Sequence, residues 1–173
     1  MQINLDFFKA VYGNCDTGKI EIRAVMSKQQ RFFNLNQLNE MNDFCGANEK
    51  EDLYFGVALR EGGGTKEHLT QIPCVWCDID YKDTPRESLN VNLKNFPFQP
   101  SIFVKSGGGM HIYWLFKEPA EKEDIQKIEN INRRIATSLG GDLNSCDAAR
   151  ILRIPGTVNH KYSHKPLCEV TEK

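Results

Sequence analysis

One stretch of the chain, residues 101–141, constrains the fold more than any other. Its first part, SIFVKSGGGMHIYWLF (101–116), has a run rich in apolar and aromatic residues on each side of three glycines, which is typical of two antiparallel strands joined by a loop. Its second part, EKEDIQKIENINRRIATSLGG (121–141), places four apolar residues on one helical stripe, begins with acids and stops at two glycines. A hairpin followed by an amphipathic helix predicts a sheet with a helix packed on it.

The other segments add helices and strands in an order typical of α+β proteins. We expect further helices at 4–12, from a cap at Asn36 to about 44, from Thr84 onward and at 147–153, and further strands at 19–26, 52–60, 72–80 and 167–171. This order predicts a mainly antiparallel sheet with packed helices.

The composition places few limits on function. A chain of 173 residues with 40% hydrophobic and 26% charged residues is typical of one globular domain. No apolar run approaches the roughly 20 residues of a membrane span, and the N-terminus has no signal-peptide pattern. We therefore expect a cytoplasmic protein without a membrane partner.

The six cysteines do not predict a metal site. Cys74 and Cys77 form C-x-x-C inside the expected strand 72–80, where they face opposite sides of the sheet and cannot both reach one ion. The other four have no ligand spacing, so we interpret the cysteines as reduced, mostly packing residues.

The charge is close to neutral overall but uneven. A net charge of −1 argues against a generally basic nucleic-acid coat. Residues 148–168 contain no acid, however, while they include two arginines, two lysines and two histidines. This basic strip fits either an anionic substrate or an ordinary solvated surface.

A pair of acids ends the expected strand 72–80. Asp78 and Asp80 in VWCDIDYKD lie two apart and point to the same side of an extended chain. Two such carboxylates repel each other and are costly to bury unpaired, so they indicate a metal ion between them or a strand end exposed to water.

The glycine loop of the hairpin is a second candidate. In Ser106–Gly109, backbone amides are able to approach an anion closely because no Cβ intervenes. His111 follows on the face that it shares with Tyr113, where it is placed to contact a phosphate. A loose turn with a hydrogen-bonded edge histidine is the alternative.

A third candidate is GGDLNSCDAARILRIPGTVNHK (140–161). Asp142 follows the end of the long helix. Asp147 precedes the expected helical run, in which Arg150 and Arg153 share one face. Asp147 is also a plausible helix N-cap.

In combination, DID, SGGGMHIYW and GGD…DAARILRIPGTVNHK resemble the catalytic core of the archaeo-eukaryotic primase superfamily, in particular the primase-polymerases of plasmids, phages and other mobile elements. The resemblance covers roughly residues 50–165. It implies one catalytic domain, 1–173, with an N-terminal α/β module (1–70) and a core with a ferredoxin-like or RRM-like sheet (71–173). The implied function is a DNA primase and DNA polymerase that makes and extends primers on single-stranded DNA from NTPs or dNTPs, with a helicase or accessory domain in a longer protein.

The resemblance also implies residue roles. The catalytic residues would be Asp78, Asp80, Asp142 and His111, with Asp147 as the alternative third acid. The acids would hold two Mg²⁺ or Mn²⁺ ions. The nucleotide-binding residues would be Ser106, Gly107, Gly108, Gly109, His111, Arg153 and Lys161, with Gly109 at the family's serine position and Ser106 upstream of it.

Two other function classes remain open. A non-catalytic RRM-like nucleic-acid-binding module would not need three acids and would expose aromatics on its sheet, whereas the aromatics here mostly follow core periodicity. A nicking enzyme would show His-x-His, which the chain lacks. A metal-dependent nuclease also uses paired acids and is not separated from a polymerase by sequence.

Overall fold

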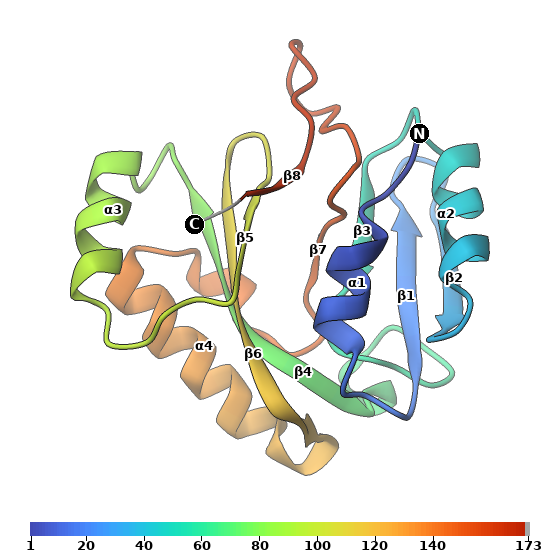
Figure 1. Cartoon of the computed structure of the whole chain (residues 1–173), viewed down its shortest axis with the longest axis horizontal. Coiled ribbons are helices and arrows are strands. Elements are labelled where there is room, and N and C mark those ends of the chain that lie inside the picture. The colour runs from blue at the N-terminus through green and yellow to red at the C-terminus, as the bar shows by residue number, and fades with distance from the viewer. Residues whose placement is uncertain (172–173) are drawn as a thin grey trace.

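The computed structural model describes residues 1–171 as two four-stranded antiparallel sheets with four α-helices (Figure 1). The helices are α1 (Leu5–Tyr12), α2 (Leu38–Ala47), α3 (Arg86–Asn95) and α4 (Ile125–Leu139), with 3₁₀ helices η1 (Lys66–His68), η2 (Lys122–Asp124) and η3 (Leu143–Ser145). The strands are β1 (Lys19–Ala24), β2 (Gln29–Asn34), β3 (Leu53–Gly56), β4 (Gln71–Asp80), β5 (Ile102–Lys105), β6 (Gly109–Glu121), β7 (Ile151–Arg153) and β8 (Glu169–Thr171). The α+β prediction is confirmed.

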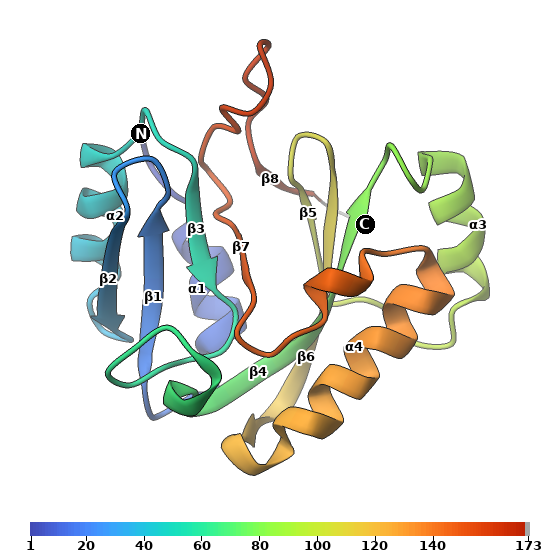
Figure 2. The same ribbon diagram turned by 180° about the vertical axis from the view of Figure 1, so that it is seen from behind.

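The core sheet has the strand order β4-β6-β5-β8. The glycine loop joins β5 to β6 as an antiparallel hairpin, as predicted. Helix α4 packs against β4 (Figure 2), and its buried Asn132 accepts a hydrogen bond from the backbone N–H of Trp76 at 3.0 Å. The helix ends at Gly140 in the left-handed conformation, with φ of 80°, which glycine adopts without strain.

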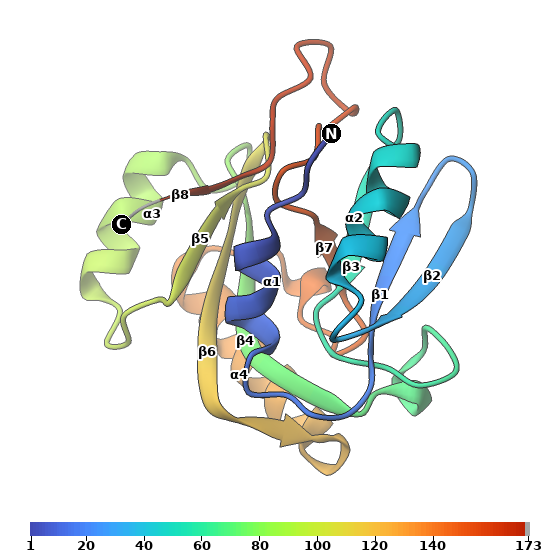
Figure 3. The same cartoon turned by 45° about the vertical axis from the view of Figure 1, so that its right-hand side comes forward.

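The second sheet has the order β2-β1-β3-β7. Helix α1 lies between the two sheets (Figure 3) and joins them through its aromatic side chains. Phe7 makes edge-to-face contacts with Phe55 of β3 at 5.4 Å and with Tyr113 of β6 at 5.5 Å between ring centroids. Since aromatic pairs of this kind stabilise by about 0.5–1.5 kcal/mol beyond their burial, α1 fixes one sheet against the other.

The expected helix at 147–153 is wrong. Residues Ile151–Arg153 form strand β7 and pair antiparallel with β3, with Arg153 opposite Tyr54. The chain therefore crosses from the end of α4 to the second sheet, whose fourth strand it supplies (Figure 2). Pairing with an open strand edge satisfies backbone groups over a long sequence separation, which local helical spacing does not reveal. As a result, Arg150 and Arg153 do not share a helical face.

A buried ion pair fixes the loop before β7. Glu21 on β1 and Arg60 are both fully buried and contact each other. Arg60 also donates to the carbonyl of Gly64 at 2.7 Å and to that of Ala149 at 2.6 Å. The carboxylate of Glu21 offsets the charge of the buried guanidinium. Through its contacts with Glu21 and Ala149, Arg60 connects β1 to the segment that precedes β7.

Smaller differences concern local details. Strand β2 was not predicted, and Asn36 does not cap α2, whose N-cap is Gln37 without a side-chain hydrogen bond. All six cysteines are free thiols, and five of them are buried. In the part of the chain that the structure describes, no helix is long and apolar enough to cross a membrane.

Candidate active site

The acids at the end of β4 lie beside the segment that follows α4. The backbone N–H of Asp142 donates to the carbonyl of Asp78 at 2.8 Å. This approach requires Gly141, because a Cβ there would lie 2.3 Å from Sγ of Cys77 and 3.0 Å from the carbonyl oxygen of Asp78. The helix stop that the sequence shows as two glycines therefore places a third acid next to the first pair.

One hydroxyl group connects two of these carboxylates. Oγ of Ser145 lies 3.2 Å from Oδ2 of Asp78 and 3.0 Å from Oδ2 of Asp142, and it is placed to donate to either. Asp142 also caps η3, since its Oδ1 accepts the N–H of Asn144 at 2.8 Å. Partial burial acts to raise the pKa of Asp142, but the hydrogen bonds from Asn144 and Ser145 outweigh it and hold the pKa below its usual value.

His111 lies opposite Asp78 in the β4–β6 register. Its Nε2 is 3.6 Å from Oδ1 of Asp78, and its Nδ1 is buried without a protein partner among the described residues. Burial lowers the pKa of His111, opposed in part by the carboxylate of Asp78, so the ring is neutral at pH 7. A buried ring nitrogen without a partner is unusual and is available to a ligand.

The glycine loop lies next to β4 without intervening side chains. Gly109 is opposite Asp80 in the register, and a Cβ on it would lie 1.7 Å from the carbonyl oxygen of Ile79. Gly107 has φ of 97°, and its N–H and that of Gly108 donate to no acceptor within residues 1–171. The carbonyl of Ser106 accepts from the side chain of Asn159 at 2.8 Å, which fixes the loop to the segment after β7.

The positively charged residues of the basic strip differ in whether an acidic side chain pairs with them. Arg153 is buried, donates to Oδ1 of Asp52 at 2.5 Å and to the hydroxyl of Tyr54 at 2.7 Å, and lies over the Tyr54 ring. Its charge is therefore already paired. Lys161 is exposed and has no ion pair within the described residues. Asp147, the alternative third acid, forms an ion pair with Arg150 at 3.1 Å and caps no helix.

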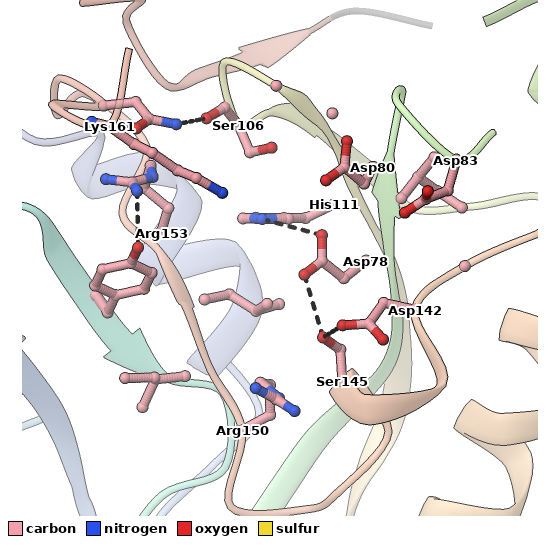
Figure 4. A pocket seen from close by; sticks show the side chains of 18 of the residues that line it. Asp78, Asp80, Asp83, Ser106, His111, Asp142, Ser145, Arg150, Arg153 and Lys161 are labelled. Carbon is pink, nitrogen blue, oxygen red and sulfur yellow. Dashed lines mark hydrogen bonds and ion pairs between the residues drawn. The ribbon is translucent and has the colours of Figure 1, made fainter. Parts of the chain in front are cut away.

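Most of the residues that the sequence singled out line one pocket of about 570 Å³ (Figure 4). Those that line it are Asp78, Asp80, Ser106, Gly108, Gly109, His111, Asp142, Arg153 and Lys161. Gly107 and Asp147 lie outside it. Figure 4 shows the acids on one wall, Arg153 and Lys161 on the opposite wall, and His111 between them.

Six polar residues of the lining had no site role predicted from the sequence: Tyr54, Asp83, Ser145, Arg150, Asn159 and Tyr162. Asp83 lies three residues after Asp80, and this spacing could have identified it as a further candidate acid. Ser145 carried no signal, because a serine in a turn after a helix is ordinary and only the tertiary contacts reveal its position between two carboxylates.

The three acids have the right ligand chemistry for a divalent cation, but their side chains do not converge on one point. Three carboxylates provide the hard oxygen ligands that Mg²⁺ and Mn²⁺ prefer, and no lysine or arginine forms an ion pair with Asp78, Asp80 or Asp142 in the described part of the chain. Across residues 1–171, however, no group of three acid, histidine or cysteine side chains converges closely enough to hold an ion. Asp80 instead accepts the N–H of Lys82 at 2.9 Å, so a third ligand requires Asp80 to rotate.

Comparison with solved structures decides the fold. The primase-polymerase (PrimPol) AEP domain of cyanophage S-2L superposes with a TM-score of 0.70 at 15% identity, over 99% of this chain and 91% of that one. The chain has the fold of an archaeo-eukaryotic primase domain. This confirms the mainly antiparallel α+β fold that the resemblance implied.

Two further structures have the same archaeo-eukaryotic primase fold. Primase RepB′ matches with a TM-score of 0.66 at 16% identity, over 98% of this chain and 56% of that one. The catalytic domain of RepB′ in complex with initiator DNA matches with 0.66 at 15% identity, over 98% and 84%. At these identities the likeness concerns the fold alone.

Sequence comparison adds one curated relative. A replication protein of Clostridium perfringens is 28% identical over 104 residues, which are 55% of this chain and 26% of that protein. The chain thus spans about a quarter of the length of this relative. No family model matches the chain.

Proposed function

We propose that this chain is the catalytic domain of a DNA primase that also extends its primers, a template-dependent nucleotidyltransferase that acts on single-stranded DNA. The observation that carries the proposal is the hydrogen bond from Asp142 to the backbone of Asp78. It unites acids from two separate motifs in one pocket with the glycine loop and Lys161. The archaeo-eukaryotic primase fold and the curated replication protein support the same reading.

The acids would bind two Mg²⁺ or Mn²⁺ ions through Asp78, Asp80 and Asp142. When bound, such ions neutralise charge at the attacking 3′-hydroxyl and at the leaving pyrophosphate. The protein would hold Asp78 and Asp142 next to each other, and Asp80 would rotate toward them when the ions bind. Ser145 holds the carboxylates of Asp78 and Asp142 side by side, and β4 holds Asp80 on the same face.

The triphosphate would lie between the glycine loop and the opposite wall of the pocket. The free N–H of Gly108 and the neutral ring of His111 are able to donate to phosphate oxygens, and Lys161 supplies an unpaired positive charge. Arg153 is engaged with Asp52 and Tyr54, so we assign it to shaping the pocket wall and leave direct phosphate contact to Lys161.

The partners follow from this chemistry. The domain would bind single-stranded DNA as template, a primer 3′ end and NTPs or dNTPs. Because the curated relative is about four times longer than the matched part, we also propose that the domain acts together with a helicase or accessory domain.

A primer-synthesis assay tests the proposal. The protein is incubated with circular single-stranded DNA, labelled nucleotides and Mg²⁺ or Mn²⁺, in separate reactions with NTPs and dNTPs. We expect labelled strands from the wild-type protein and none from the Asp78→Ala/Asp80→Ala variant. Degradation of the circle would identify a nuclease instead, and DNA binding without synthesis or degradation would identify a non-catalytic module.

A further inference from the structure

A groove lies on the other side of the glycine loop from the pocket. It consists of two hollows of about 340 and 270 Å³, both lined by Tyr81, Arg86 and Lys105. Gly109 lines the first hollow and also the active-site pocket. The groove, defined by these three shared side chains, therefore begins at the edge of the active site. The residues that line the second hollow belong mostly to α3, β5 and β8, and Figure 1 shows where these elements lie.

The groove carries positive charge that the protein itself does not neutralise. Within residues 1–171, neither Arg86 nor Lys105 has a carboxylate at ion-pair distance, and Glu169 is the only acid among the residues that line the two hollows. Lys105 is exposed. On a chain with a net charge of −1, two unpaired cations in one groove next to the catalytic acids indicate an anionic ligand.

The groove also offers flat and apolar surface. The guanidinium of Arg86 lies 4.7 Å from the ring centroid of Tyr81, whose side chain is half-buried. The second hollow adds apolar side chains from α3 and β5, among them Leu93 and Phe103. Cations beside an aromatic ring and an apolar floor are the combination that binds single strands, since phosphates contact the cations and bases lie on the rings.

We propose that this groove binds single-stranded template DNA and leads it to the active site. The inference rests on the proposed function and names the path of its template. An acidic peptide would also contact the cations. It would not need a groove that adjoins the nucleotidyl-transfer pocket at Gly109, and this adjacency favours the template strand.

Binding of a fluorescent oligothymidylate, measured by anisotropy without nucleotide or metal, tests the groove. For Arg86→Ala/Lys105→Ala we expect affinity to fall at least about tenfold, and the slope of log K against log salt to decrease by roughly 1.4, because each lost phosphate contact removes about 0.7. Tyr81→Ala should weaken binding by about fivefold or more, as loss of base stacking does. Thermal melting of each variant checks that the fold is retained.

Arg31→Ala is the matched control, because Arg31 also lies over an aromatic ring, that of Phe44 at 5.7 Å, but on β2 of the other sheet. It should bind the oligonucleotide as the wild type does. Wild-type DNA affinity in Arg86→Ala/Lys105→Ala would overturn the inference, as would a loss of DNA affinity equal to that of Arg31→Ala. A selective loss of nucleotide affinity in place of DNA affinity would also overturn it, by making the groove a nucleotide site.

The outcome is separable from that of the proposed function. Asp78→Ala/Asp80→Ala should bind the oligonucleotide with wild-type affinity although it makes no product. If the wild type binds DNA through Arg86 and Lys105 but makes no strand, the groove stands and the polymerase assignment fails. If the wild type makes strands while the groove variants bind DNA normally, the groove fails and the assignment stands.

Discussion

The backbone N–H of Asp142 donates a 2.8 Å hydrogen bond to the carbonyl of Asp78. This contact places the first residue after the glycine stop of α4 directly beside the end of β4. Because the bond is made by the backbone, it fixes the position of Asp142 whatever its side chain does. The side chain is then free to cap η3 and to share the hydroxyl of Ser145 with Asp78.

Ser145→Ala should weaken binding of divalent metal. Its hydroxyl is the donor between the carboxylates of Asp78 and Asp142, and residues that orient metal ligands typically contribute about 10–100-fold to metal affinity. We expect the Mn²⁺ affinity, measured by calorimetry, to fall at least about tenfold.

Ser138→Ala is the control for Ser145. The hydroxyl of Ser138 donates to the carbonyl of Arg134 on an exposed part of α4, so the Mn²⁺ affinity of this variant should match the wild type. Equal affinities for Mn²⁺ in both variants would show that Ser145 does not orient the metal-binding carboxylates.

His111→Ala should weaken nucleotide binding selectively. Loss of one hydrogen bond to a charged group costs about 1.5–3 kcal/mol, which corresponds to at least roughly a tenfold loss of affinity. Calorimetry with NTP or dNTP and Mn²⁺ should show this loss, while the affinity for single-stranded DNA stays near that of the wild type. Unchanged nucleotide affinity would assign His111 to packing against Asp78.

Arg60→Ala should destabilise the protein strongly. It removes the cation that contacts Oε2 of the fully buried Glu21 and leaves only Arg23 at Oε1. Loss of a buried ion-pair partner typically costs about 3–5 kcal/mol, which lowers Tm by roughly 6–20 °C in a domain of this size. Lys19→Ala, which breaks the exposed pair with Glu61, should cost less than about 1 kcal/mol. Similar melting temperatures for the two variants would show that the buried pair contributes little.

The thiols should react slowly in the native protein. Burial raises the pKa of Cys15 to about 11 and that of Cys45 and Cys168 to about 12. A raised pKa means less thiolate, so at pH 8 only roughly a thousandth of Cys15 is reactive. A chromogenic disulfide reagent should therefore modify native protein far more slowly than free cysteine, and all six thiols after unfolding in urea. Rapid native reaction of several thiols would contradict the burial described here.

The parts of the fold that follow local periodicity were predictable. Apolar residues recur along α4 at helical spacing, and the β5–β6 hairpin has an apolar run on each side of its glycines. The sequence therefore predicts both elements directly. Strand β2 exposes most of its side chains at a sheet edge and has no such repeat. Strand β7 is short and depends on pairing with β3, which local spacing does not encode.

Site residues were predictable where the reactive side chains lie close together in one segment of the sequence. Asp78 and Asp80 share a strand, and the glycines of the hairpin precede His111 by a fixed spacing, so these residues could be named in advance. The position of Ser145 depends on how α4 ends against β4. The pairing of Arg153 with Asp52 joins residues far apart in the chain, and sequence reasoning therefore took its charge as free.

Nucleotide incorporation by an Asp142→Asn variant tests the central claim most directly. Asparagine caps η3 as well as aspartate does and still accepts from Ser145, so this change removes the charge and leaves the fold. On circular single-stranded DNA with Mn²⁺, we predict that the wild type and Asp147→Asn incorporate labelled nucleotide and that Asp142→Asn incorporates none above background. Wild-type incorporation by Asp142→Asn would contradict the claim that Asp142 acts with Asp78 and Asp80 in nucleotidyl transfer.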